Sequence, residues 1–498
     1  MNVLGFYLGK HDSNITIVHD GKATYFKSER LTQIKHHKAD LKWINDICEK
    51  NSFKPDLVCF SDGNRNGLGV CNIGELFQES TKMFGAKTFC IDHHYAHILS
   101  AWMLGNATSA KYGICIDGRG DNNTRISIIE NPFQIEHSKI IKSSCNYQYC
   151  MFFQELGKYM GLSGLSWDYA GKIMGLQAYG NINSKLVGMY YTKDFMQHPL
   201  ALLKKTYHQI PINELFIKNE SLFKDWLASI HFLIQKFIVE IFTTNFKSDD
   251  IIVYSGGCAQ NTVINTNLNS IFSNLLIPPH CYDGGISLGC AYFAAKYINE
   301  EININEFPFC NGMDDLGYAS EKTINQVADL LAKGKIVGWA QGKSEIGPRA
   351  LGHRSILANP TIDGMKNVLN FRVKKREYWR PFAASVLLEN LNYFTDSMNE
   401  YPYMLHAVNI LKKLNNNYES IIHCDNTCRF QTVDYSKPLL TYRTLLNIMQ
   451  KEYNINALLN TSLNINGKPI ALTHHNCLEN YNYSSIDAIC IGNNLLVK

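Results

Sequence analysis

The stretch Lys335–Pro360 constrains the fold most, because a short apolar run leads directly into a loop rich in glycines and cations. The apolar residues that end at Ala340 predict a buried strand. Glycines in the following loop allow the backbone to approach a ligand closely. The cations of this loop are Lys343, Arg349 and Arg354. Their side chains suit phosphate and carboxylate oxygens, so the pattern favours an oxyanion-binding loop for a phosphate ester over a solvated basic loop.

The length of the chain indicates two or more domains, because single cores stop growing at about 250–300 residues. A segment with Pro308, Gly312 and Gly317 has the composition of a linker. We therefore expect one domain over residues 1–305, a linker over 306–320 and a second domain over 321–498. The net charge of +4, from 48 basic and 44 acidic residues, is too small to indicate nucleic-acid binding.

The 15 cysteines are scattered and include no Cys-x-x-Cys pair. They predict reduced thiols in a cytosol, packed mostly as small apolar side chains. The first residues carry no basic region ahead of their apolar run, and no apolar run reaches the about 18 residues of a membrane span. We expect a cytoplasmic protein with neither a signal peptide nor a transmembrane helix.

The first thirty residues predict three strands at the start of a sheet. These strands are Val3–Leu8, Asn14–His19 and Lys22–Lys27, and an Asp-Gly turn joins the last two. A strand, a polar turn and a second strand also open the sugar-kinase and actin-like nucleotide-binding folds. His11 lies in the polar turn, where an exposed turn residue and a general base remain equally open interpretations.

A histidine pair follows the predicted strand 87–92. His93 and His97 are four residues apart, so on a helix both imidazoles point from one face, as in two-histidine metal sites. Asp117 ends the strand Tyr112–Asp117 and is either a metal ligand or part of an ordinary Asp-Gly turn. Asp283 begins a glycine-rich turn and is a candidate third ligand.

Two further glycine-rich turns suggest nucleotide contacts. Gly256 and Gly257 lie between the strand Asp250–Tyr254 and a helix, where a nucleotide can lie against the backbone. Lys172, in another segment with several glycines, is either solvated or meets a phosphate. The segment Phe223–Thr243 predicts a long core helix.

Several motifs in one order make the chain resemble the NodU/CmcH-type O-carbamoyltransferase family, which includes antibiotic and nodulation-factor carbamoyltransferases. The resemblance covers nearly the whole chain and is weakest over 181–224. The matching motifs include His11-Asp12, Glu29-Arg30, His93-His94-x-x-His97, Asp117-Gly118, Gly171-Lys172, Ser255-Gly256-Gly257 with Asn261, Asp283-Gly284-Gly285, Gln341–Pro360, Arg380-Pro381-Phe382-Ala383, Arg429-x-Gln431 and Leu459-Asn460-Thr461-Ser462-x-Asn464.

The resemblance implies an α/β chain with two kinds of domain. The amino-terminal domain would have the actin-like, ATPase-related (ASKHA) fold, and the carboxyl-terminal domain would be an α+β YrdC-like domain. The latter would bind carbamoyl phosphate and ATP and form carbamoyl-adenylate. The former would transfer the carbamoyl group to a hydroxyl of a small acceptor such as a sugar, a glycoside or another secondary metabolite. A homodimer is a further expectation.

The resemblance also implies roles for individual residues. His93, His97, Asp117 and Asp283 would hold a divalent metal, Fe(II) by analogy, although such ligands do not separate iron from zinc or manganese. His11 would be the general base. The cationic residues that would surround carbamoyl phosphate are Lys343, Arg349, Arg354, Arg376, Arg380 and Arg429. Further residues would contact the nucleotide, which binds with Mg²⁺. They are Lys172, Gly256, Gly257, Asn261, Gly284 and Asn464.

The chain departs from the family pattern at a few positions. Ala170 and Lys468 stand where glutamates are usual, Leu463 replaces an aromatic residue and Asn426 replaces a glycine. These departures leave the identity of the acceptor open. Two other functions remain as alternatives: a tRNA threonylcarbamoyladenosine-type synthase, which predicts a more basic surface, and a non-catalytic nucleotide-binding relative.

Overall fold

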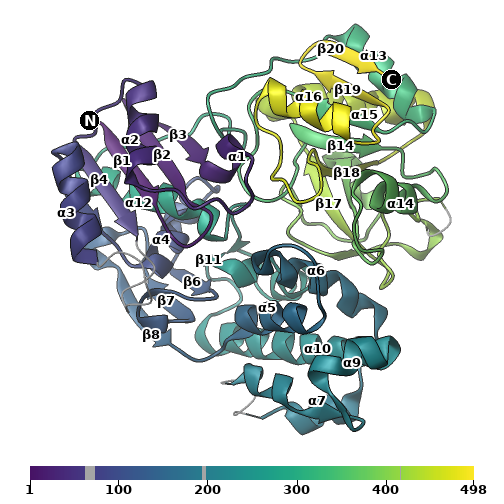
Figure 1. The fold of residues 1–498 in the computed structure, drawn as a ribbon, viewed down its shortest axis with the longest axis horizontal. Helices are drawn as coiled ribbons and strands as arrows, with labels where there is room; N and C mark the ends of the chain where they lie inside the picture. The colour runs from purple at the N-terminus through teal and green to yellow at the C-terminus, as the bar shows by residue number, and fades with distance from the viewer. Residues whose placement is uncertain (62–72, 193–197, 415–416) are drawn as a thin grey trace. The chain divides into compact units, whose positions relative to one another are not determined.

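The computed structural model describes residues 1–61, 73–192, 198–414 and 417–498 (Figure 1). The chain forms two compact units. The first unit comprises Val3–Gly9 and Pro55–Glu300, and the second comprises Met1–Asn2, Lys10–Lys54 and Glu301–Lys498. The grouping differs from the expected division at 306–320, because Lys10–Lys54 belongs with the carboxyl-terminal residues.

One sheet of the first unit contains three parallel strands: β1 (Val3–Tyr7), β4 (Leu57–Ser61) and β5 (Lys87–Cys90). Every residue of β1 and β4 is buried, as in parallel strands that helices cover. Helix α12 (Ile286–Tyr297) packs on both strands. Helix α3 (Ile73–Phe84) packs on β5.

The other sheet of the first unit has the strand order β12-β11-β6-β7-β8. Its strands are β6 (Tyr112–Ile116), β7 (Ile126–Glu130), β8 (Lys139–Ser144), β11 (Ile252–Ser255) and β12 (Leu275–Leu276). Strand β11 is parallel to β6 and β12, whereas β7 is antiparallel to β6 and β8. Helix α4 (His93–Leu99) packs on this sheet and on α12, so the two helices connect the sheets. A Cβ at Gly289 of α12 would collide with the α4 backbone at Ala96, so this close crossing requires glycine.

Helices form most of the rest of the first unit (Figure 1), together with a short antiparallel pair of β9 (Thr206–Tyr207) and β10 (Ile210–Pro211). The helices are α5 (Tyr149–Tyr159), α6 (Tyr169–Leu176), α7 (Ser184–Tyr190), α9 (Ile212–Lys218), α10 (Glu220–Asn245) and α11 (Thr262–Asn269). Among the described residues, α10 alone has the length and apolar character of a membrane span. However, 61% of its most apolar window is buried inside the protein, as in the core helix predicted over Phe223–Thr243.

The second unit begins with the predicted hairpin of β2 (Asn14–His19) and β3 (Lys22–Lys27). Helices α1 (Ser28–Thr32) and α2 (Leu41–Lys50) follow. Backbone hydrogen bonds join the hairpin to the segment after residue 300: Ala23 N–H donates to Asn303 O, and Gly312 N–H donates to Tyr25 O. These long-range bonds explain why residues 10–54 belong to the second unit.

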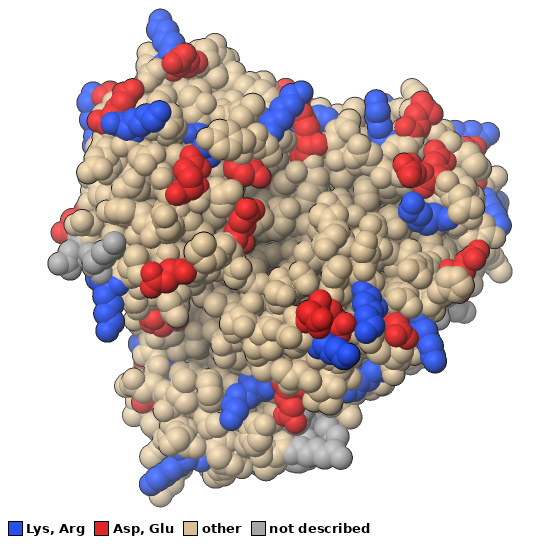
Figure 2. Space-filling model, turned by 180° about the vertical axis from the view of Figure 1, so that it is seen from behind, with Lys and Arg blue, Asp and Glu red and all other residues tan. Residues whose placement is uncertain are grey.

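The core of the second unit is an eight-stranded mixed sheet with the order β16-β17-β15-β18-β14-β13-β19-β20. Its strands are β13 (Val337–Ala340), β14 (Arg354–Ala358), β15 (Ala383–Leu387), β16 (Val408–Asn409), β17 (Thr427–Val433), β18 (Leu458–Ser462), β19 (Ala488–Ile491) and β20 (Asn494–Val497). Its helices are α13 (Glu321–Ala332), α14 (Met365–Val368), α15 (Leu440–Tyr453) and α16 (His474–Tyr483). The expected α/β class is confirmed. On the face in Figure 2, lysines and arginines are interspersed with acidic residues.

The expectation that all cysteines are reduced is wrong at one pair. Cys150, at the start of α5, forms a disulfide with Cys258, which follows β11. The fold brings their Cα atoms to 6.0 Å across a sequence separation of 108 residues, which no local pattern reveals. The other described cysteines are free thiols, and most are buried.

Candidate functional site

Four predicted metal ligands meet inside the first unit. Asp92 caps α4 through its side chain, and the helix carries His93 and His97 on one face. Asp117 follows β6, and Asp283 stands in the turn before α12. One ligand atom from each of the four residues lies within 4.8 Å of the others. His97 Nε2 is 3.3 Å from Asp283 Oδ1, and His93 Nε2 is 3.7 Å from Asp117 Oδ2.

The imidazoles of this cluster are buried without ordinary hydrogen-bond partners. Within the described part of the chain, neither nitrogen of His93 or His97 has one. Burial lowers the pKa of His93, but Asp117 and Asp283 outweigh it and raise the pKa well above its usual value. Buried polar atoms normally find partners, and two imidazoles with two carboxylates are a common donor set for a divalent metal. The residues therefore fit the expected metal.

Neighbouring donors hold the two carboxylates in place. Gly257 N–H donates to Asp117 Oδ1 at 2.6 Å, and the Tyr7 hydroxyl donates to Asp283 Oδ2 at 2.7 Å. Gly256 has φ +91°, and a Cβ there would collide with Ile116 O, so this turn requires glycine. The next residue of the turn, Gly257, supplies the N–H that supports Asp117. Nothing in the sequence pattern singles out Tyr7, because its partner lies 276 residues away.

The other predicted nucleotide ligands of the first unit contact residues of the same unit. Lys172 Nζ donates to Ser163 O at 2.6 Å. Asn261 accepts a hydrogen bond from Ile264 N–H at the start of α11, and its Nδ2 lies 2.9 Å from His231 Nε2. Gly284 is buried beside Asp283. Their contact with a nucleotide stays a prediction.

In the second unit, four predicted arginines influence one another. Burial lowers the pKa of Arg376 well below its usual value, and Arg380, Arg429 and Arg349 lower it further. Burial acts likewise on the pKa of Arg429, with Arg349 and Arg380 adding to the effect. Mutual repulsion among these half-buried cations is relieved when an anion binds beside them. We call Arg349, Arg376, Arg380 and Arg429 the arginine cluster.

Two neighbours shape this cluster. Arg376 Nε donates to Asn370 Oδ1 at 2.7 Å, and its guanidinium lies over the Phe382 ring. Arg380 is 3.5 Å from Glu377 Oε2. Lys343, predicted in the same site, is half-buried.

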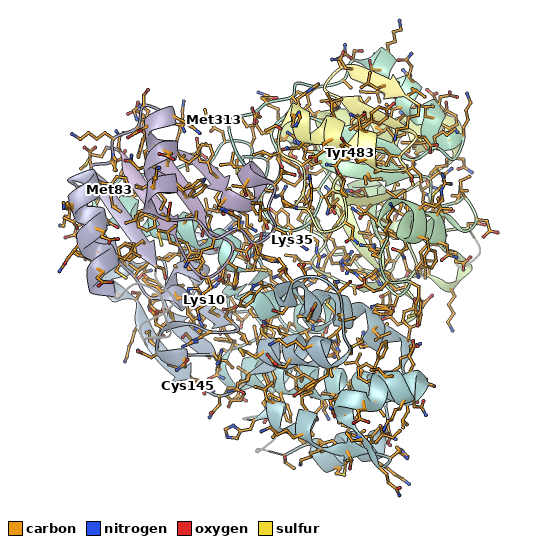
Figure 3. The ribbon with its side chains drawn as sticks, in the orientation of Figure 1. Lys10, Lys35, Met83, Cys145, Met313 and Tyr483 are labelled. Atoms are coloured by element: carbon orange, nitrogen blue, oxygen red, sulfur yellow. A yellow bond between two sulfur atoms is a disulfide. The ribbon has the colours of Figure 1, made fainter. Side chains whose placement is uncertain are left out.

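Lys374 is a buried cation near the cluster that the sequence motifs do not single out as a site residue. Its Nζ donates to Ser462 O at 2.6 Å and to Asn464 Oδ1 at 2.7 Å. Burial lowers its pKa well below the usual value, and Arg376, Arg380 and Lys35 add to this effect. Lys35 follows α1 and is labelled in Figure 3.

Two predicted ligands are engaged within the fold. The guanidinium of Arg354 donates five hydrogen bonds to the carbonyl oxygens of Gln341, Gly342, His353 and Leu472. These bonds match the five N–H donors of an arginine, so Arg354 braces the loop. The carboxamide of Asn464 accepts from Lys374 and donates to Lys468 O. These contacts do not favour the predicted role of either side chain as a ligand.

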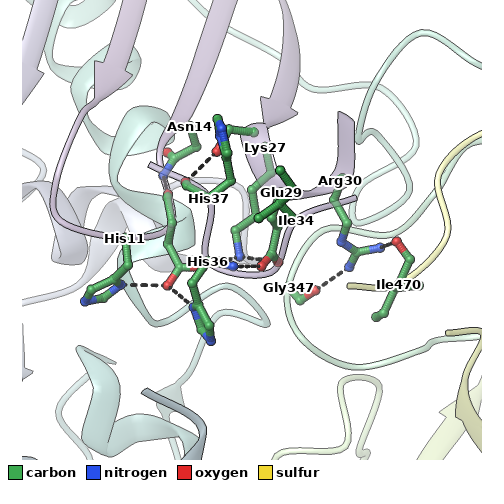
Figure 4. A network of polar contacts seen from close by, with 12 residues as sticks. His11, Asn14, Lys27, Glu29, Arg30, Ile34, His36, His37, Gly347 and Ile470 are labelled. Atoms are coloured by element: carbon green, nitrogen blue, oxygen red, sulfur yellow. Dashed lines mark hydrogen bonds and ion pairs between the residues drawn. The ribbon is translucent and has the colours of Figure 1, made fainter. Parts of the chain in front are cut away.

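His11 belongs to a third group of polar side chains. Its Nδ1 lies 2.7 Å from Asp12 Oδ2, and His36 Nδ1 lies 2.9 Å from the same oxygen (Figure 4). Arg30, nearby in the chain, donates a hydrogen bond to Gly347 O. Gly347 lies in the predicted oxyanion-binding loop within Lys335–Pro360. The amino-terminal turn and that loop therefore belong to the same unit.

The departures from the family pattern have local structural counterparts. Asn426 has φ +60°, a conformation in which glycine is common and asparagine is tolerated. Lys468 forms an ion pair with Glu479. Ala170 lies within α6.

Two family models match the chain: one described as Carbamoyltransferase N-terminus over residues 75–292 and one described as Carbamoyltransferase C-terminus over 328–498. Among curated relatives, nodulation protein NolO of Bradyrhizobium diazoefficiens is 27% identical over 82% of this chain and 79% of its own. The 3'-hydroxymethylcephem-O-carbamoyltransferase of Streptomyces clavuligerus is 25% identical over 94% of this chain and 93% of its own.

Solved structures with similarity include component A of the (R)-2-hydroxyglutaryl-CoA dehydratase of Acidaminococcus fermentans. It is 15% identical with a TM-score of 0.37, over 60% of this chain and 98% of its own. Full-length HypF is 16% identical with a TM-score of 0.34, over 61% of this chain and 56% of its own.

Proposed function

Because the chain belongs to the carbamoyltransferase family, we propose that it is an ATP-dependent O-carbamoyltransferase that works through carbamoyl-adenylate. The observation that carries the donor half of this proposal is the arginine cluster, in which the charges acting on half-buried guanidinium groups are mainly those of other arginines. Such a cluster suits the phosphate oxygens of carbamoyl phosphate and ATP, because guanidinium groups bind phosphates in a bidentate manner.

The donor reaction would have two balanced steps. One water cleaves carbamoyl phosphate to carbamate and phosphate. A carbamate oxygen then attacks the α-phosphorus of MgATP, so that pyrophosphate leaves and carbamoyl-adenylate forms. Arg349, Arg376, Arg380, Arg429 and Lys343 would bind and orient the phosphates, while Arg354 would hold the loop through its five carbonyl contacts.

In the transfer step a hydroxyl oxygen of the acceptor would attack the carbamoyl carbon and AMP would leave. His11 would take the hydroxyl proton. His93, His97, Asp117 and Asp283 would hold a divalent metal, Fe(II) or another, which would supply Lewis acidity for a carbonyl or phosphoryl oxygen. Tyr7 and Gly257 would keep the two carboxylates oriented. We propose a sugar, a glycoside or another secondary metabolite as the acceptor and the cytoplasm as the location.

The test is donor turnover in purified, metal-loaded protein. ATP and carbamoyl phosphate are added without an acceptor, and pyrophosphate and AMP are followed beside Arg349→Ala and Arg443→Ala. Arg443 is a matched control because Glu389 already neutralises it. We expect pyrophosphate release that requires carbamoyl phosphate, that falls about 100-fold in Arg349→Ala and that persists in Arg443→Ala. Failure of the folded wild type to release pyrophosphate, even with a panel of hydroxylated acceptors, would contradict the proposal.

A further inference from the structure

A single buried carboxylate holds two imidazoles in the second unit. His11 Nδ1 and His36 Nδ1 lie 2.7 and 2.9 Å from Asp12 Oδ2. The two rings are perpendicular, with centroids 6.0 Å apart. The side chains of His11 and His36 are 21% and 14% exposed, whereas that of Asp12 is 2% exposed (Figure 4). The two histidines thus have equivalent relations to the carboxylate and similar access to ligands.

One cation lies against this carboxylate and the neighbouring Glu29. Lys27 Nζ lies 2.6 Å from Asp12 Oδ1 and 2.7 Å from Glu29 Oε1. Arg30 follows in the chain, but its guanidinium donates to Gly347 O. Burial raises the pKa of Asp12, but Lys27 and the two histidines outweigh it and hold the pKa well below its usual value. Asp12 is therefore an anion that accepts hydrogen bonds.

This arrangement fixes the tautomer of both histidines. A neutral imidazole that donates Nδ1–H to a carboxylate carries its lone pair on Nε2, the nitrogen at the opposite side of the ring. The carboxylate also stabilises the imidazolium that forms when Nε2 takes a proton, as in the Ser-His-Asp arrangement of hydrolases. His36 has the same hydrogen bond as His11 and therefore the same chemical capacity.

The backbone around these groups is held in an uncommon conformation. Asp12 and His36 have φ +60° and +54°, in the left-handed region. Hydrogen bonds fix both turns: Asn14 Nδ2 donates to Asp12 O at 2.6 Å, and His36 N–H donates to Glu29 Oε2 at 2.9 Å. Such conformations persist where the surrounding structure imposes them, and they concentrate at functional sites.

A metal is a poorer occupant of this group than a proton. His11, Asp12 and His36 have a spacing that a metal would accept. However, the Lys27 ammonium already neutralises Asp12 at 2.6 Å, and both Nδ1 atoms are at hydrogen-bond distance from the carboxylate. A further cation would meet the repulsion of Lys27.

We propose that His36 is a second catalytic histidine of the transfer step, sharing Asp12 as a positioning residue with His11; this inference rests on the proposed function. Nε2 of either imidazole takes the proton of the acceptor hydroxyl as its oxygen bonds to the carbamoyl carbon. The bond from that carbon to the phosphate oxygen breaks, and its electron pair leaves with AMP. The imidazolium then returns its proton to solvent.

The experiment compares His11→Gln, His36→Gln, the double variant and His19→Gln with the full-length wild type. His19 is a control because it is exposed and lies on the same hairpin. In single turnovers with ATP and carbamoyl phosphate, water serves as the acceptor, and pyrophosphate and AMP are followed separately. We expect unchanged pyrophosphate formation in all variants. AMP release should fall about 3–10-fold in each single variant and about 100-fold or more in the double variant.

A second measurement needs no activity. Nitrogen NMR of ¹⁵N-histidine-labelled protein, assigned with the same variants, should show His11 and His36 as Nδ1–H tautomers, and Asp12→Asn should remove this preference. An Nε2–H tautomer for His36, or a double variant no slower than His11→Gln, would overturn the inference while leaving adenylate formation intact. Absence of pyrophosphate from the wild type would instead overturn the proposed function and, with it, the transfer role of His36.

Discussion

The buried polar groups of the two units have opposite electrostatic requirements. In the first unit, two imidazoles face two carboxylates, and the imidazole nitrogens have no ordinary hydrogen-bond partner among the described residues. In the second unit, other arginines of the cluster lower the pKa of Arg376 and of Arg429, and Glu377 lies 3.5 Å from Arg380. Burying charge without compensation is costly, so we expect the first cluster to favour a cation and the second an anion. This difference is the basis for proposing a metal in one unit and phosphate groups in the other.

The groups that hydrogen-bond to the charged side chains also differ between the two units. Hydrogen-bond donors, the Tyr7 hydroxyl and Gly257 N–H, support the carboxylates of the metal site. Carbonyl oxygens support two cations of the second unit, since Arg354 and Lys374 donate to backbone oxygens.

Loss of a metal ligand should have the largest effect. His97→Ala should abolish stoichiometric metal binding and slow carbamoyl transfer about 10³-fold, because a metal contributes several kcal/mol of charge stabilisation. Metal analysis and single-turnover transfer check this. His94→Gln is the control, because His94 lies on the same helix but its Nδ1 is 2.8 Å from Ser127 Oγ, outside the cluster. Full metal content in His97→Ala would show that His97 is not a metal ligand.

Removal of a cluster arginine should act on the donor instead. Arg429→Ala should raise the KM for carbamoyl phosphate about 100-fold, since a charge-assisted hydrogen bond contributes about 1.5–3 kcal/mol. Metal content should not change. Steady-state kinetics of pyrophosphate release provide the measurement, and an unaltered KM would mean that the cluster does not bind the donor.

Tyr7→Phe tests the support of the metal site. The variant keeps the ring but loses the hydroxyl that donates to Asp283. We expect about 10-fold weaker metal binding, as for other groups that orient a ligand. Titration of apoprotein with Mn²⁺ or Co²⁺ measures the affinity. Equal affinity in both proteins would show that Tyr7 does not orient Asp283.

Arg354→Lys should affect folding more than kinetics. A lysine keeps the charge but cannot reproduce the five carbonyl contacts, so the free energy of unfolding should fall by about 3 kcal/mol. Denaturant unfolding checks this, and the KM for carbamoyl phosphate in the folded variant should stay within about 3-fold of wild type. A large rise in KM without loss of stability would make Arg354 a ligand after all.

The Asp12 group differs from both clusters, because the cation that contacts its carboxylates is Lys27, a residue of the protein itself. The lowered pKa of Asp12 stabilises the folded protein above the ordinary value of 3.8, and this contribution is lost as the pH falls through the folded pKa. The stability difference between wild type and Asp12→Asn should therefore shrink as the pH falls below about 4. Unfolding curves at a series of pH values measure it. A difference that does not shrink in this range would contradict the lowered pKa of Asp12.

Local patterns predict much of the fold and of the candidate metal site. The spacing of His93 and His97 requires only a helix, and the alternation around Asp20-Gly21 requires only a hairpin, so both follow from near neighbours. The glycine turn at Gly256 is equally local.

Long-range contacts account for what the sequence does not reveal. Tyr7 meets Asp283, Cys150 meets Cys258, and Ala23 meets Asn303, each across many residues. The sequence also does not reveal that Arg354 braces carbonyl oxygens, because its acceptors include Leu472, 118 residues away.

The most direct test of the central claim follows the carbamoyl carbon itself. Purified, metal-loaded protein is mixed with ATP and ¹³C-carbamoyl phosphate, quenched within one turnover and examined by mass spectrometry and carbon NMR. We expect ¹³C in carbamoyl-adenylate, the mixed anhydride with AMP. It should form together with pyrophosphate and be absent in Arg349→Ala. Label found only in carbamate or bicarbonate, with ATP intact, would contradict this claim.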